Sequence, residues 1–193
     1  MLIWRLLRYE SVVSSLNLID RLLDHQNCFI LLISSSIMEL KDALKKVESS
    51  ETFLDWKKDH HDSFLAHALV MFDGKWHLGY FDQNKITSFL MNDEVVISDG
   101  QDVLSSGETI EPLDLSMISI SPSEAFEIAE SVRKNNYSSE LITNKFFILQ
   151  SFGKKPIYNA TLLTRSFKTL NVKIDASTKE VISHSLAVLA DFG

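Results

Sequence analysis

The sequence contains few of the residues that enzyme signatures require. It has one cysteine, Cys28, with six glycines and three prolines in 193 residues. A single cysteine excludes a disulfide framework within the chain and a cysteine-based metal site, and it fits a reducing compartment. No phosphate-binding loop, dinucleotide fingerprint or G-x-S-x-G nucleophile motif occurs. We therefore expect no catalytic residues and no cofactor.

Positive charge is also scarce. The chain has 19 lysines and arginines against 26 aspartates and glutamates, which gives a formal net charge of −7 and a pI near 5.3. Binding to nucleic acid depends on clustered lysine and arginine side chains that contact phosphates. The composition therefore predicts an acidic, soluble protein without a nucleic-acid partner.

Long apolar runs are missing as well. A spanning helix needs about 20 consecutive apolar residues, and the apolar run that begins at Cys28 ends well short of that even if it is extended to Met38. No small-residue cleavage site follows, so residues 1–37 do not match a signal peptide. We expect a cytoplasmic protein that starts naturally at Met38, with residues 1–37 as an N-terminal extension. The alternatives are that this segment is a helix covering apolar surface, or that it makes the protein secreted or membrane-associated.

Residues 38–111 indicate a first α+β module, which begins with a helix. Leu40, Ala43, Leu44 and Val47 have the spacing of a helix with one buried stripe. A second short helix is expected after Ser50, which is a suitable N-cap. Two short strands are expected later in the module, at Lys85–Met91 and Glu94–Ser98.

A β-hairpin is the clearest local signal in this module. Asp73-Gly74 separates two apolar runs, and Asp-Gly favours a two-residue type I′ turn. That turn pairs His67 with Tyr80 and sets His67 and His77 on opposite faces. The face with His67 also includes Trp76, Leu78 and Tyr80. Both faces are largely apolar, so the hairpin should be covered on both sides.

Residues 112–193 indicate a second module with the same order of elements. Ser121-Pro122-Ser123-Glu124 predicts a helix start with a capping box and proline at the first helical position. Four strands are expected after this helix: Lys145–Phe152, Ile157–Thr164, Phe167–Asp175 and Glu180–His184. The predicted fold class is α+β, with two helix-plus-antiparallel-sheet modules in tandem and a cystatin-like architecture.

The second module resembles the PepSY domain over residues 119–185. The segments that show the resemblance are Ile120–Ala125, Pro156–Thr161 and Val172–Val181. The usual ending of the family is a strand followed by Asp-Ala-x-Thr-Gly-Glu-Val, and Lys179 stands here in place of the glycine. We expect Lys179 to adopt a positive φ. The resemblance implies one helix packed on an antiparallel sheet, and a non-enzymatic module that binds or restrains other proteins, often peptidases.

Candidate site residues fall into two groups. His60, His61 and Asp62 are the candidate metal ligands, because imidazole and carboxylate groups bind zinc, although we favour a polar connection between helix and strand as their explanation. Trp76, Leu78, Tyr80 and His67 are the candidate interaction surface, although core packing is the other explanation for side chains at strand spacing.

These observations favour a non-catalytic interaction or regulatory module. We expect it to hold a protein or peptide partner, or a second copy of itself, through a sheet face or an edge strand. The alternative is a small-ligand-binding protein or enzyme with a pocket between the two sheets.

Overall fold

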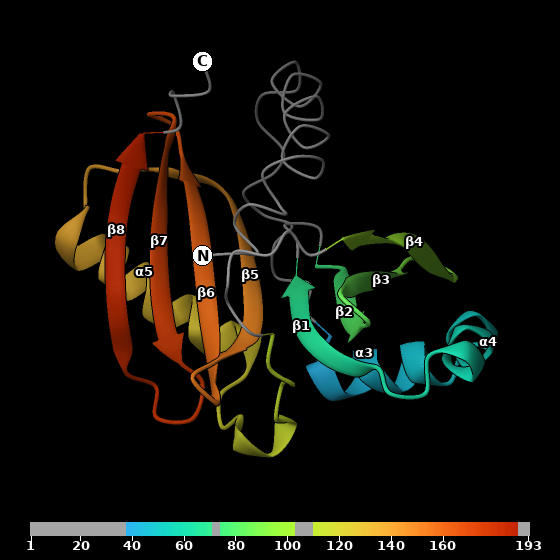
Figure 1. The fold of residues 1–193 in the computed structure, drawn as a ribbon. Helices are drawn as coiled ribbons and strands as arrows, with labels where there is room; N and C mark the ends of the chain where they lie inside the picture. Colours follow the sequence, from blue (N-terminus) through green and yellow to red (C-terminus); the bar gives the residue numbers. More distant parts are fainter. Residues whose placement is uncertain (1–37, 71–73, 103–109, 189–193) are drawn as a thin grey trace, which may run out of the picture. The chain divides into compact units, whose positions relative to one another are not determined.

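The computed structural model describes residues 38–70, 74–102 and 110–188. These residues form three α-helices, one short 3-10 helix and eight strands (Figure 1). The helices are α3 (Leu40–Glu48), α4 (Glu51–Asp59), η1 (Leu115–Met117) and α5 (Pro122–Asn136). The strands are β1 (Phe64–Val70), β2 (Trp76–Asp82), β3 (Lys85–Met91), β4 (Val95–Asp102), β5 (Ile142–Phe152), β6 (Lys155–Thr164), β7 (Lys168–Asp175) and β8 (Val181–Val188).

None of the helices within these ranges is long and apolar enough to cross a membrane. The predictions made for residues 1–37 lie outside the described residues.

All eight strands belong to one sheet, so the prediction of two helix-plus-sheet modules in tandem is wrong. The strand order is β4-β3-β2-β1-β5-β6-β7-β8. β1 and β5 pair antiparallel from His67 opposite Gln150 to Val70 opposite Phe147. This pairing joins the strands of the two halves into one sheet. In two separate sheets, β1 and β5 would be apolar edge strands whose backbone groups lack partners. The fold is predominantly β, built on a single antiparallel sheet.

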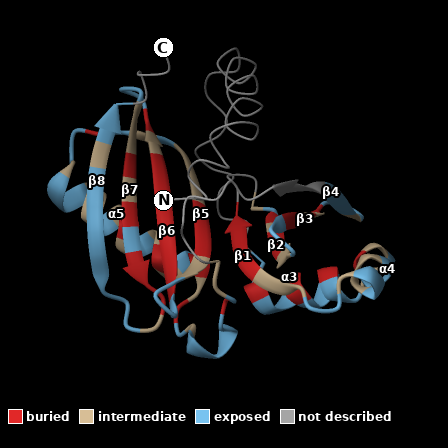
Figure 2. Ribbon diagram, in the orientation of Figure 1, coloured by how far each residue is buried: buried red, intermediate tan, exposed pale blue. Residues whose placement is uncertain are grey.

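The helices cover one face of this sheet, which we call the helix-covered face. α3 contacts β2 and β3, and α5 contacts β6 and β7. The side chains below the helices belong to one apolar core that continues across the β1–β5 junction. One row of this core crosses five neighbouring strands at Trp76, Val70, Phe147, Ala160 and Val172. Buried positions accordingly follow the central strands in Figure 2.

The register of the β1–β2 hairpin differs from the prediction by one residue. Val70 pairs with Trp76, and His67 pairs with Gly79 where Tyr80 was expected. An odd number of residues therefore connects the paired residues Val70 and Trp76, whereas the predicted two-residue turn requires an even number. A shift of one residue moves each side chain to the other face. His67 and His77 consequently share the face opposite the helices, and the prediction that they lie on opposite faces is wrong.

Local signals in the sequence predicted the helices accurately. The Ser121 hydroxyl accepts a hydrogen bond from the Glu124 N–H at 3.2 Å, and the Glu124 carboxylate accepts one from the Ser121 N–H at 2.9 Å. This is the predicted capping box, with Pro122 in the first turn. The Ser50 hydroxyl caps α4 by accepting from the Phe53 N–H. The predicted buried stripe of α3 is also confirmed, since all four of its residues are buried.

We expect Leu78→Ala to lower the free energy of unfolding by about 2–5 kcal/mol, the usual cost of truncating a buried leucine. Leu78 is fully buried in the centre of β2. Urea denaturation followed by circular dichroism measures the change. The matched control is Leu54→Ala on α4, where the side chain is 52% exposed, and its effect should stay within about 0.5 kcal/mol. Equal losses in the two variants would contradict this account of the core.

Candidate functional site

The strand β8 forms one edge of the sheet and exposes most of its side chains. Of its eight residues only Leu186 is partly buried, and the others are exposed (Figure 2). Ile182 is 54% exposed and Val188 is 65% exposed. Val181 is 37% exposed as well, so Val181 and Ile182 at one end of the strand and Val188 at the other present apolar side chains to solvent.

β8 lacks charged side chains and proline, two of the features that normally protect an edge strand. Natural edge strands avoid pairing with other chains by means of charged side chains, prolines, bulges or short length. Val181–Val188 contains no lysine, arginine, aspartate, glutamate or proline. An irregularity lies near its start, where Val181 pairs with Ile174 and Ser183 with Lys173. The remaining residues continue in regular register to Val188.

The opposite edge of the sheet differs in composition. The exposed acidic residue Glu94 directly precedes strand β4. A charged side chain at the end of an edge strand opposes pairing with a like-charged strand. β8 contains no lysine, arginine, aspartate or glutamate, so this opposition is missing there.

The inner side of β8 is firmly attached to the rest of the fold. It pairs with β7 from Ile174 opposite Val181 to Lys168 opposite Val188, with one irregularity at Ile182. On the helix-covered face, the Tyr137 hydroxyl at the end of α5 lies 2.8 Å from His184 Nδ1. These contacts fix the strand in position, so its outer edge is preorganised for binding.

A tight turn between β7 and β8 sets where β8 begins. The Asp175 carboxylate accepts hydrogen bonds from the N–H groups of Ser177 and Thr178 at 2.8 and 3.1 Å. The Asp175 N–H donates to the Glu180 carbonyl at 2.9 Å. Lys179 has a φ of +70°, which confirms the prediction made from the missing glycine.

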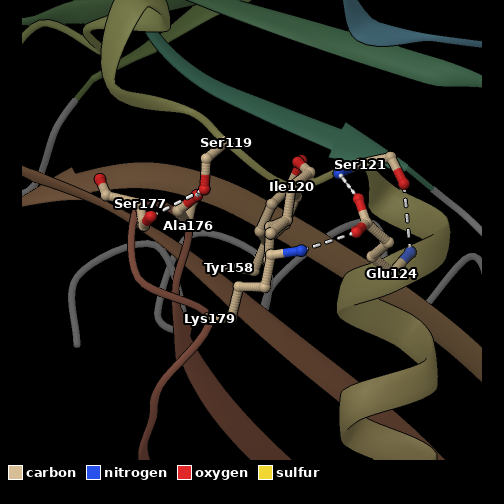
Figure 3. Close-up of polar contacts among 8 residues, drawn as sticks. All are labelled: Ser119, Ile120, Ser121, Glu124, Tyr158, Ala176, Ser177 and Lys179. Carbon is tan, nitrogen blue, oxygen red and sulfur yellow. Dashed lines mark hydrogen bonds and ion pairs between the residues drawn. The ribbon is translucent and has the colours of Figure 1, made fainter.

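Figure 3 shows how this turn is connected to the start of α5. The Lys179 ammonium lies 2.9 Å from the Glu124 carboxylate of the capping box. The Ser119 hydroxyl donates to the Ser177 carbonyl at 2.7 Å, and the Tyr158 hydroxyl donates to the Ile120 carbonyl at 3.3 Å. The segments Ile120–Ala125, Pro156–Thr161 and Val172–Val181 thus meet in one network of contacts.

The capping box also affects the charge of this junction. The pKa of the Glu124 carboxyl lies below its usual range. The hydrogen bond from the Ser121 N–H is the main cause, and the Lys179 ammonium is the second cause. Hydrogen bonds to the charged form of a carboxylate stabilise that form. Glu124 therefore remains ionised, and its contact with Lys179 persists into mildly acidic solution.

Three of the predicted surface residues lie in the core. Trp76, Leu78 and Tyr80 are each at most 4% exposed, on the helix-covered face. The Trp76 indole donates to the Met38 carbonyl at 2.8 Å, and the Tyr80 hydroxyl donates to the Glu48 carboxylate at 2.8 Å. Burial, followed by the Glu48 carboxylate, raises the pKa of the Tyr80 hydroxyl. These side chains stabilise the helices on the sheet and do not form a surface.

His67, the fourth predicted surface residue, is buried on the opposite face. Its ring lies over the backbone of Gly79, where a β-carbon would collide with the imidazole. Burial, and then the neighbouring His77, lower the pKa of His67 to about 4. Its Nδ1 atom has no hydrogen-bond partner within the described part of the chain. His67 is therefore a neutral packing residue at neutral pH.

The candidate metal ligands lie at the end of α4. The His60 ring stacks on Trp56 with 4.3 Å between the ring centroids, and its Nδ1 lies 2.8 Å from the Trp56 carbonyl. His61 and Asp62 are exposed in the turn that follows. Across residues 38–70, 74–102 and 110–188, no group of three histidine, cysteine or acidic side chains is placed to hold a metal ion.

The position of β8 at an edge is the feature that the sequence analysis missed. The predicted strand ended at His184, whereas β8 continues to Val188. An uncharged run of eight residues after a turn was the available signal. Which strand lies at an edge depends on the pairing of all the others, and short-range patterns do not contain that information.

No family model matches the sequence, and neither does any curated protein. Among solved structures, the chain is similar to a protein described as a "putative lipoprotein" from Clostridium difficile 630. The match has a TM-score of 0.49 and 15% sequence identity, and it covers 70% of this chain and 90% of that chain. At this level of similarity we transfer neither fold nor function from that protein.

We expect the stability of the protein to fall as the pH decreases from about 6.5 to about 4, because of His67. The unfolded chain has a histidine pKa near 6.5, and the folded chain has one of about 4. In this window the unfolded state binds more protons, so acid favours unfolding by up to roughly 3 kcal/mol in total. Above pH 6.5 this residue contributes no pH dependence.

Urea denaturation at several pH values measures this effect, and His67→Leu is the comparison. The variant removes the titrating group, so its stability should depend less on pH between 4 and 6.5. Parallel profiles for the two proteins would show that His67 does not cause the dependence.

We expect Lys179→Gly to be more stable than Lys179→Ala by about 0.5–1 kcal/mol. Both variants lose the exposed ion pair with Glu124, but only alanine keeps a β-carbon at a positive φ. Thermal denaturation of the two variants isolates the cost of the backbone conformation. If alanine proves as stable as glycine, the turn does not require a positive φ at this position.

Proposed function

We propose that this chain is a non-catalytic interaction module that binds an extended protein segment along the outer edge of β8. The observation that supports this proposal is an edge strand of eight residues without a charged side chain or proline, together with exposed Ile182 and Val188. Strand addition to an exposed sheet edge is a recurring mode of peptide recognition.

In this mode the backbone supplies affinity, and the side chains supply selectivity. The N–H and C=O groups on the outer side of β8 would form a ladder with the added strand. Apolar residues of the partner would cover Ile182 and Val188, which removes apolar surface from water. Because β7, Tyr137 and the Asp175 turn already fix β8, little ordering of this chain opposes binding.

The PepSY resemblance of residues 119–185 favours the same function. That family is associated with modules that bind or restrain other proteins, so a restraining or inhibitory role toward the partner is part of our proposal. The single cysteine favours a reducing compartment, and we place the interaction in the cytoplasm.

Site-specific photo-crosslinking in the native cells tests this function. A photoreactive amino acid at Ser183, exposed on β8, should give one defined adduct, whereas the same amino acid at Ser131, exposed on α5, should not. Similar adducts from the two positions, or none from Ser183, would contradict the proposal.

Ser185→Lys should reduce the adduct formed from position 183 by roughly tenfold, since a lysine on an edge strand disfavours pairing with another strand. Ser185 is exposed, so the stability of the fold should change by less than about 0.5 kcal/mol. Ser131→Lys is the matched control and should leave the adduct unchanged. An undiminished adduct in the Ser185→Lys variant would show that the partner does not pair along β8.

A further inference from the structure

We draw no further inference here: the strongest candidate, the cluster of His67, Gln150 and Asn159 on the sheet face opposite the helices, where each side chain has a buried polar atom without a hydrogen-bond partner within the described ranges, carries no proposal because nothing in the structure shows what covers that face.

Discussion

The pairing of β1 with β5 is the interaction on which the rest of the structure depends. It is the junction between strands of the first and second halves of the chain. Through this pairing Val70 continues the row of core side chains from Trp76 to Phe147. It also moves β1 and β5 from the edge of a sheet to its centre. Among the described strands only β4 and β8 are left as edges, and β8 is exposed as a result of that arrangement.

Short-range patterns in the sequence predicted most of the helices and strands, but few of the pairings between the strands. The capping box at Ser121 and Glu124 forms as expected, because every atom involved lies within one helical turn. The positive φ of Lys179 was predicted from one substitution in a turn motif. Both features are determined by neighbours in the chain, so the sequence is sufficient to find them.

Features that depend on distant pairing were predicted incorrectly or missed. The Asp-Gly signal indicated the β1–β2 hairpin but not its register, and the observed register places His67 and Trp76, which were predicted to share a face, on opposite faces. The joining of the two halves depends on apolar strands finding each other across a long separation. The same limit applies to the candidate site, since β8 becomes an edge only when the other strands have been ordered.

The β1–β5 junction also has a consequence for how the chain reaches this structure. Val70 and Phe147 are 77 residues apart in sequence. In each of the other strand pairs whose register is described, the two strands follow one another along the chain. Contacts between distant residues form slowly, because closing a long loop costs entropy before the contact stabilises it. We expect the hairpins of each half to form early and the junction to form late. Until it forms, β1 and β5 expose apolar edges, and the chain is most prone to aggregate during that interval.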